Sequence, residues 1–585
     1  MHRRFETTTT RRQRTLDGTW EFTTEPTDED SMPGAFPADA DTVPVPCAWN
    51  ALPEYYDHHG PAWYRRTFSL PESDSVRVRF LAVSHEATVY LDGEEQVEHS
   101  GGYTPFEFVA EDLAAGEHEL VVRAVNGRSE TTIPLPETDW FDYGGITREV
   151  ILETVSDTFV EEFDLRYDLE ADDSNGDGAG EGGSSGDGGD PEETARIRAD
   201  VEVANLAGDA KRTVAVTVGE TTARETVTVP AGGGTCSLEF DVPSVDRWTL
   251  EEPTLSDVRV ALEADDEVVD DRRDRIGFRE LAVDGRDVLL NGEPVDLRGV
   301  NRHEDHPEWG AAQPLRVMRE DLARIREAGM NCVRASHYPN HPRFLDLCDE
   351  AGVLVIEEIP YWHFDAEDFA REDLLERGVT TLEEMISRDR HHPSVFAWSL
   401  TNECANEQEG VAEATERLAT TARDVDDSRL VTLASYNEWV DRGEDRCLEH
   451  CDFACVNGYY GWYTDERVTA DQWTGFLERV KADHEMPIVV SEFGAGAVEG
   501  ERTWERGKWS ETYQTEFFET VLPVLLADDD LAGFTVWQFC DTRTSRDPMG
   551  RPKSKNNKGI VGEYRRPKAA YGTVRRLLSD AETDA

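Results

Sequence analysis

The chain has 585 residues, too many for one ordinary core, which predicts about three domains. Its 59 Lys and Arg stand against 122 Asp and Glu, a net charge of −63, but frequent aromatic residues and long apolar periodic stretches exclude an acidic disordered protein. The acidic residues are spread over the whole chain, which argues against a nucleic-acid mimic. Only seven residues are lysine. This composition favours adaptation to high salt, where surface carboxylates keep a protein hydrated.

The N-terminal segment 1–18 holds an arginine pair but no apolar stretch follows it, so we do not expect a secretory signal. No apolar run is long enough to span a bilayer. The nine cysteines are odd in number and scattered, which argues against a disulfide framework. Cys447, Cys451 and Cys455 are spaced by four, but no second cysteine pair or suitably placed histidine accompanies them. These features predict a reduced, cytoplasmic protein without a metal site.

Residues 1–155 contain short apolar runs such as VRVRFLAV, ATVYLDG and HELVVRAVNG, separated by Gly and Asp turns. This spacing predicts an N-terminal jelly-roll-like β-sandwich. Residues 156–277 carry another set of strands, which predicts an immunoglobulin-like β-sandwich of about seven strands. The stretch 171–190 interrupts this set with glycine and acidic residues that could not anchor a core. We expect it to be a disordered loop between two strands.

Over residues 278–585, apolar strands alternate with amphipathic helices. In one such helix, Met318, Leu322 and Ile325 recur at helical spacing. The eight strand candidates are 295–301, 331–336, 353–359, 395–402, 430–436, 452–458, 487–493 and 531–539. This alternation predicts a C-terminal catalytic (β/α)8 TIM barrel, whose active site lies at the carboxyl ends of the strands.

The fourth strand ends in SLTNE and the seventh in VSEFG, which places Glu403 and Glu492 at that rim. Taken singly, a glutamate at a strand end is usually a solvated loop residue or a charge at a helix N-terminus. Two of them in one barrel match the needs of glycosidic cleavage, where one carboxyl protonates the departing oxygen and the other stabilises the anomeric carbon. Asn402 offers an amide that could hold the sugar 2-hydroxyl.

The order of domains, TNE on strand four and SEFG on strand seven together resemble family 2 glycoside hydrolases, which include β-galactosidases, β-mannosidases and β-glucuronidases. The resemblance covers nearly the whole chain. It implies that Glu403 is the general acid/base, with a raised pKa, and that Glu492 is an ionised nucleophile. The motifs GVNRHEDH and RASHYPN also resemble family segments at the barrel mouth, and imply that His337 contacts the substrate. The chain departs from the family at Cys404, which replaces the usual proline, and in SEF, which replaces SEY.

A basic stretch follows the eighth strand, in a chain that otherwise avoids lysine. Its cations are Arg543, Arg546, Arg551, Lys553, Lys555 and Lys558. The residues alone leave open a site for an anionic sugar, a solvated basic loop and a salt-bridge partner for a neighbouring subunit. A nucleic-acid patch is disfavoured, because no other basic surface extends it.

Within this stretch, NNKG at 556–559 resembles the Asn-x-Lys signature of β-glucuronidases, which implies that Asn556 and Lys558 hold the sugar carboxylate. Three more segments, WFDYGGITR, VNGYYGWY and VWQFCDTRT, also resemble β-glucuronidases. The sugar-pocket residues that they imply are Asp139, Asn457, Tyr459, Tyr463 and Trp537. A tryptophan at a strand end is also common in a plain barrel core. β-Glucuronidases usually carry an arginine a few residues before Asn-x-Lys. At that position this chain has Pro552, with Arg551 and Lys553 on either side. We assign the role of the second cation at the sugar carboxylate to Arg551.

The sequence therefore predicts a retaining β-glucuronidase that is adapted to salt and cleaves a small-molecule or oligosaccharide glucuronide. It predicts no cofactor and no nucleic-acid or membrane partner, and the family resemblance implies a homodimer or homotetramer. One alternative is another family 2 enzyme such as a β-galactosidase, for which the Asn-x-Lys match would be accidental. Another is an inactive carbohydrate-binding protein, which would be expected to have lost one of the two carboxyls.

Overall fold

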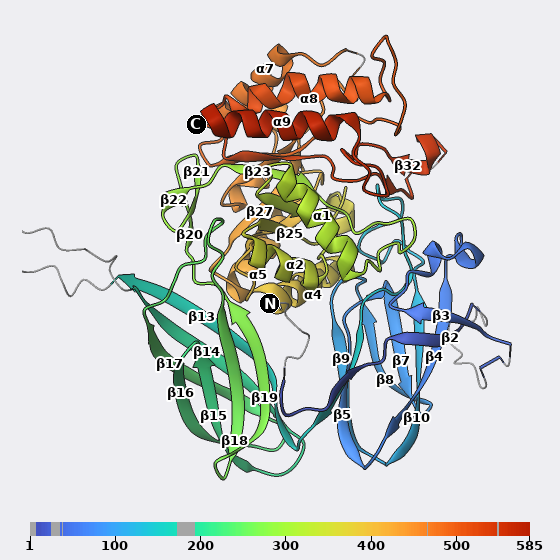
Figure 1. Cartoon of the computed structure of the whole chain (residues 1–585), viewed down its shortest axis with the longest axis vertical. Helices are drawn as coiled ribbons and strands as arrows, with labels where there is room; N and C mark the ends of the chain where they lie inside the picture. The colour runs from blue at the N-terminus through green and yellow to red at the C-terminus, as the bar shows by residue number, and fades with distance from the viewer. Residues whose placement is uncertain are drawn as a thin grey trace, which may run out of the picture.

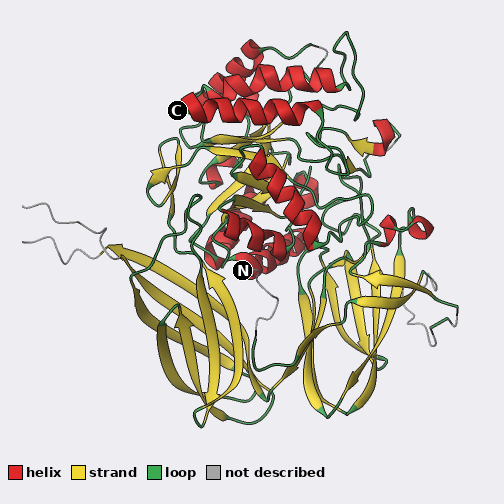
Figure 2. Ribbon diagram, viewed as in Figure 1, coloured by secondary structure: helices red, strands yellow, loops and turns green. Residues whose placement is uncertain are grey.

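The computed structural model describes residues 8–24, 36–37, 39–171, 193–464, 466–546 and 549–584. Figure 1 shows two β-sandwiches side by side beneath a third body, which is built of both strands and helices. Figure 2 shows that the helices concentrate in this third body. The predicted architecture of an N-terminal β-sandwich, a second β-sandwich and a C-terminal barrel is confirmed.

The N-terminal sandwich consists of a four-stranded sheet, in the order β1-β12-β5-β9, and a six-stranded sheet, in the order β3-β2-β4-β10-β7-β8. Its strands are β1 (Gln13–Thr15), β2 (Gly18–Thr23), β3 (Asp41–Val45), β4 (Pro61–Leu70), β5 (Asp74–Phe80), β6 (Val83–Ser84), β7 (Glu86–Leu91), β8 (Glu94–Ser100), β9 (Phe106–Leu113), β10 (Gly116–Val125), β11 (Gly145–Ile146) and β12 (Val150–Val155). Alternate residues face the core between the sheets, as Trp20 and Phe22 do in β2. The loop between β10 and β11 leads towards the barrel.

The second sandwich consists of a three-stranded sheet, β13-β14-β17, and a four-stranded sheet, β16-β15-β18-β19. Its strands are β13 (Thr158–Ala171), β14 (Glu193–Asn205), β15 (Ala210–Val218), β16 (Thr221–Val229), β17 (Gly234–Pro243), β18 (Ser256–Ala264) and β19 (Glu267–Ile276). This division is that of an immunoglobulin-like sandwich. The predicted insert at 171–190 lies, beyond its first residue, outside the described residues, and the strands on either side of it, β13 and β14, pair antiparallel.

The barrel is a closed parallel sheet that follows a small sheet of β20 (Leu281–Asp284), β21 (Asp287–Leu290) and β22 (Glu293–Pro294). Its eight strands are β23 (Leu297–Asn301), β24 (Cys332–Ala335), β25 (Leu354–Glu358), β26 (Val395–Asn402), β27 (Leu430–Tyr436), β28 (Ala454–Asn457), β29 (Ile488–Phe493) and β30 (Gly533–Val536). Each lies within its predicted range. Two short strands, β31 (Thr542–Arg543) and β32 (Lys555–Asn556), pair beyond β30.

The helices cover the outside of the barrel strands (Figure 2). They are α1 (Leu315–Glu327), α2 (Pro342–Ala351), α3 (Ala366–Phe369), α4 (Glu372–Asp389), α5 (Glu409–Val425), α6 (Asn437–Asp441), α7 (Ala470–Asp483), α8 (Glu511–Leu526) and α9 (Ala569–Asp584). The predicted apolar stripe of α1 is buried, with Met318, Leu322 and Ile325 in the barrel core. Helix α2 ends where Gly352 adopts a φ of 65°, a conformation that favours glycine.

All nine cysteines are buried and none of them forms a disulfide. Burial raises the pKa of thiols such as Cys332, Cys404 and Cys447 above the ordinary range, so these cysteines are inert core residues. No helix in the described part of the chain is long and apolar enough to cross a membrane.

Candidate active site

The carboxyl ends of the barrel strands surround a cavity of about 350 Å³ into which both glutamates open. Strand β26 is buried at every position, and Glu403 follows it with a φ of 50°, which is uncommon for a residue other than glycine. Glu492 is the penultimate residue of β29. Ten of the twelve residues that the sequence predicted for the site line this cavity, namely Asp139, His337, Asn402, Glu403, Tyr459, Tyr463, Glu492, Trp537, Arg551 and Lys558.

Two donors hold the Glu492 carboxylate in place. Arg334 Nη1 donates to Oε1 at 2.8 Å, and the Tyr459 hydroxyl donates to Oε2 at 2.6 Å. Arg334 is completely buried and is itself fixed by two bonds from Nη2 to the Glu358 carboxylate, at 3.0 and 2.8 Å. Arg334 was not among the predicted site residues, although it begins the RASHYPN motif near the end of the second barrel strand. With both oxygens held, the Glu492 carboxylate has a fixed orientation at the cavity wall, as a nucleophile requires.

The Glu403 carboxylate has two neighbours of its own. Asn457 Nδ2 donates to Oε1 at 3.0 Å, and His363 Nε2 lies 3.1 Å from Oε2. Asn457 does not line the cavity itself but also donates to Asn402 Oδ1 at 3.2 Å. Arg334 Nη2 donates to the same Asn402 oxygen at 2.8 Å. Because that oxygen faces two donors, the amide nitrogen of Asn402 is left to donate to a sugar hydroxyl, as the sequence predicted it could.

The pKa values of the two glutamates do not follow the predicted order. Burial raises the pKa of Glu492 to about 8; the Arg334 guanidinium acts in the opposite direction and the Glu403 carboxylate in the same one. Burial also acts to raise the pKa of Glu403, but the hydrogen bond and charge of His363 outweigh it, so this pKa is lowered. The prediction of a raised pKa on Glu403 and an ionised Glu492 is therefore wrong for the protein alone. The two interacting carboxyls nevertheless titrate as a pair that holds one proton between its two pKa values.

An aromatic and histidine wall borders the two carboxylates. The His337 ring stacks on Trp537 with centroids 5.0 Å apart, and its Nδ1 lies 2.7 Å from Glu358 Oε1. Burial lowers the pKa of His337, so the ring is neutral, with Nδ1 donating to Glu358 and Nε2 turned towards Glu492. Trp537 lines the cavity rather than belonging only to the barrel core, which leaves its ring available to contact a sugar.

The opposite wall is cationic and joins two domains. Lys558 is 4% exposed, and its Nζ donates to the Tyr463 hydroxyl at 2.7 Å. Asp139 comes from the loop between β10 and β11 of the N-terminal sandwich and forms an ion pair with Arg551. Asn556 does not line the cavity, but its Nδ2 donates to Asp139 Oδ2 at 3.3 Å. This loop of the first domain therefore completes the barrel site.

The basic stretch after β30 is divided between the cavity and its surroundings. Arg551, Lys558 and Arg546 line the cavity, whereas Lys553 does not, which favours Arg551 as the predicted second cation. Arg543 lies between the rings of Tyr56 and Phe141, 3.6 and 3.4 Å from their centroids. Lys555 forms an ion pair with Glu563. Most of this stretch is thus explained by specific contacts and not by a solvated loop.

Four further residues line the cavity that the sequence analysis did not assign to the site. They are Trp362, His363, Tyr436 and Arg546. The first three could have been found from the rule that barrel sites lie at strand ends, because Trp362 and His363 follow the third strand and Tyr436 ends the fifth. Arg546 was visible only as one member of a basic stretch.

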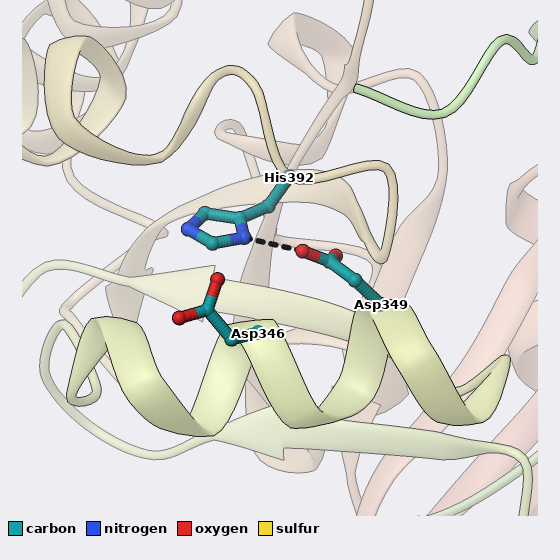
Figure 3. A group of neighbouring side chains, drawn as sticks. All are labelled: Asp346, Asp349 and His392. Carbon is teal, nitrogen blue, oxygen red and sulfur yellow. Dashed lines mark hydrogen bonds and ion pairs between the residues drawn. The ribbon is translucent and has the colours of Figure 1, made fainter. Parts of the chain in front are cut away.

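One group of side chains elsewhere in the described residues has the composition of a metal site. Figure 3 shows Asp346 and Asp349, both from α2, beside His392. His392 Nδ1 lies 2.6 Å from Asp349 Oδ2, while the backbone and hydroxyl of Ser394 donate to Asp349 Oδ1 at 3.1 and 2.6 Å. These bonds already engage both oxygens of Asp349, so we interpret the group as a polar contact that joins α2 to the start of β26.

A barrel of this kind, with two carboxylates, a directed amide and an aromatic wall around a polar cavity, defines a glycoside hydrolase. Residues 281–582 match the TIM barrel domain of glycosyl hydrolases family 2, residues 13–156 match its sugar binding domain, and residues 185–279 match the remaining family 2 domain. The chain belongs to glycosyl hydrolase family 2.

Several proteins are similar to this chain over nearly its whole length. The structure of a β-galacturonidase from Eisenbergiella tayi, bound to galacturonate, has a TM-score of 0.88 and 32% identity and covers 99% of both chains. The β-glucuronidase from Ruminococcus gnavus has a TM-score of 0.84 and 27% identity, covering 97% of this chain and 98% of that one. The β-glucuronidase of Paenibacillus borealis is 28% identical over 612 residues, 97% of each chain.

Proposed function

We propose that this protein is a retaining exo-acting β-glucuronidase, which removes a terminal β-D-glucuronic acid residue. The observation that carries the proposal is Lys558, a buried cation in the same cavity as the two glutamates. Among the described residues no carboxylate forms an ion pair with it, and its ammonium group donates to the neutral Tyr463 hydroxyl. A buried charge is costly unless it is paired, and the C6 carboxylate of a uronic acid would supply the partner.

In the proposed reaction, Glu492 attacks the anomeric carbon while the bond from that carbon to the leaving oxygen breaks. Glu403 gives its proton to the leaving oxygen, which departs as an alcohol, and the sugar remains bonded to Glu492. Glu403 then takes a proton from water, whose oxygen attacks the anomeric carbon and releases Glu492. Arg334 and Tyr459 hold Glu492 in line throughout, and Asn402 donates to the 2-hydroxyl. These steps need one proton on the pair of carboxyls, which is what the pair holds between its two pKa values.

A β-galacturonidase is the second candidate, supported by the similarity to the Eisenbergiella tayi enzyme. Glucuronic and galacturonic acid differ only in the configuration at C4, so Lys558 would meet the same carboxylate in either sugar. The two candidates differ in the side chains that contact the C4 hydroxyl of the bound sugar. A sugar with the wrong configuration at C4 leaves those polar side chains unpaired, which lowers its rate of hydrolysis strongly.

The test is a comparison of p-nitrophenyl β-D-glucuronide, β-D-galacturonide and β-D-galactopyranoside with the purified protein in molar KCl. We expect the glucuronide to have the highest kcat/KM, and proton NMR of the first-formed sugar to show the β-anomer, as retention requires. A preference for the galacturonide would establish the second candidate. A preference for the galactopyranoside would overturn both, because it would leave Lys558 without a role in substrate choice.

The proposal extends to conditions and assembly. The charge of −63 supports adaptation to high salt, because at molar salt the Debye length falls to about 3 Å and the carboxylates no longer repel one another over distance. We expect unfolding and loss of activity on dialysis to about millimolar salt, and full activity there would contradict the adaptation. A cytoplasmic homodimer or homotetramer is proposed from the family resemblance, and light scattering in molar salt measures the assembly.

A further inference from the structure

We propose that Arg546, seated on Trp362 at the cavity, binds an anionic group on the leaving part of the substrate. The preferred substrate is then an acidic oligosaccharide in which the terminal uronic acid is linked to a second residue that carries a carboxylate or sulfate. This inference rests on the proposed function and extends it from the sugar that is removed to the group that departs.

The first observation concerns which cations of the cavity have counter-ions. Arg551 is paired with Asp139, whereas Lys558 and Arg546 form no ion pair with any described carboxylate. A chain with 122 acidic and 59 basic residues has carboxylates to spare for pairing its cations. Two cations in one substrate cavity that have no counter-ion among the described residues fit a ligand with two anionic groups. Lys558 accounts for the first of these groups, and Arg546 is left for the second.

The second observation is that the two cations lie along different paths from the catalytic glutamates. One path runs from Glu492 through its bond to Tyr459, whose ring centroid is 5.1 Å from that of Tyr463, to Lys558. This is the side on which the C6 carboxylate is expected.

The other path starts at Glu403, whose carboxylate lies 3.1 Å from His363 Nε2. The next residue back, Trp362, carries the Arg546 guanidinium 5.1 Å from its ring centroid. Because Glu403 is the group that protonates the departing oxygen, side chains reached through Glu403 border the departing group and not the sugar ring.

The third observation is that Arg546 is held in position by its backbone. Its N–H donates to the Thr138 carbonyl at 2.9 Å, and the N–H of Ser545 donates to the Trp140 carbonyl at 3.3 Å. Trp362 is 9% exposed and so provides a firm support for a stacked guanidinium. The planar donor edge of a stacked arginine stays free for two parallel bonds to a carboxylate or sulfate.

The experiment compares two aryl glucuronides that differ in one charge on the departing group. They are 4-carboxyphenyl β-D-glucuronide and the compound in which the benzoate, but not the sugar carboxylate, is a methyl ester. Arg546→Gln is expected to lower kcat/KM for the carboxylate about tenfold, mainly through KM, because a partly exposed charge-assisted contact is lost. The same variant is expected to lower kcat/KM for the ester much less, because the ester offers Arg546 no anionic group, so the ratio of the two kcat/KM values falls. Arg546→Lys, which keeps the charge, is expected to recover much of the loss. The matched control is Lys553→Gln, which removes a charge from the same stretch outside the cavity.

An equal loss of kcat/KM on both substrates, or no loss on either, would overturn the inference about Arg546. Hydrolysis of the ester by the unmodified protein would still uphold the proposed function. If the unmodified protein hydrolysed neither the glucuronide esters nor the corresponding galacturonides, both proposals would fail. Repeating the comparison with 4-sulfophenyl β-D-glucuronide separates the two sources of the anion, since a larger Arg546 effect on the sulfonate points to a sulfated neighbour and a larger effect on the carboxylate to a uronic acid.

Discussion

Replacing Lys558 with methionine separates the role of its charge from that of its bulk. The variant keeps an apolar stem of similar length but removes a cation that is 4% exposed. Burial lowers the pKa of Lys558 from 10.5 to about 8. A lysine whose pKa is lower in the folded than in the unfolded state destabilises the fold below the folded pKa, and this shift corresponds to about 3 kcal/mol at pH 7. Lys558→Met is therefore expected to unfold at a higher temperature than the unmodified protein.

The same substitution is expected to reduce activity on uronides. A uronate carboxylate bound without its cation would be buried and unpaired, so kcat/KM for p-nitrophenyl β-D-glucuronide should fall about 10²-fold or more. The low activity on the neutral β-D-glucopyranoside should not fall, because that sugar has no carboxylate. Lys555→Met is the matched control, since Lys555 pairs with Glu563 outside the cavity and its loss should not change the ratio of the two rates. Loss of stability, or an equal loss on both substrates, would refute the reasoning and make Lys558 a structural residue.

Three further predictions concern Glu403, the charge of Lys558 and a buried ion pair of the sandwich domains. Glu403→Ala should slow hydrolysis of p-nitrophenyl β-D-glucuronide by about 10²- to 10⁴-fold but that of the 2,4-dinitrophenyl glucuronide much less, because a good leaving group needs no proton; equal slowing would argue against an acid role. The ratio of kcat/KM for the glucuronide to that for the neutral glucoside should fall about tenfold per pH unit above pH 8, as Lys558 loses its charge; the ratio cancels the titration of the glutamates, and a constant ratio up to about pH 10 would contradict the assignment. Glu153 is fully buried, lies 2.8 Å from Arg11 and 3.5 Å from Arg272, and has a pKa lowered to about 2, so Glu153→Gln should lower the free energy of unfolding at pH 7 by about 3 kcal/mol. In the unmodified protein this contribution is present above pH 4.5 and is lost as the pH falls through 2, which urea titrations across that range would detect.

Much of the barrel could be predicted because its signals are local. Strands buried on both faces read as short apolar runs, and each observed barrel strand lies inside a predicted run. Parallel strands bring their carboxyl ends to one rim whatever the details of packing, so Glu403 and Glu492 could be placed at one site from their positions at strand ends. The charge of −63 likewise follows from composition alone.

The pKa order of the two glutamates could not be predicted in this way. It depends on the neighbours of each carboxylate. His363 reaches Glu403 because the chain after β25 continues beside the end of β26, where Trp362 and Asn402 form a parallel bridge. Burial and charge at a given atom depend on elements that are far apart in the sequence, and no pattern of residue types along the chain records them.

The classes of the three domains, the strands of the barrel and the two glutamates at its rim could be predicted from local patterns, because periodicity and strand ends are properties of neighbouring residues. The packing of the domains is what brings Asp139 of the N-terminal sandwich to Arg551, leaves Lys553 out of the cavity lining and places Arg546 over Trp362. The Asp139 and Arg551 side chains lie 412 positions apart along the chain. Such contacts arise from how whole domains pack against one another, and the physical reason that they escape sequence analysis is that each depends on the sum of many other contacts.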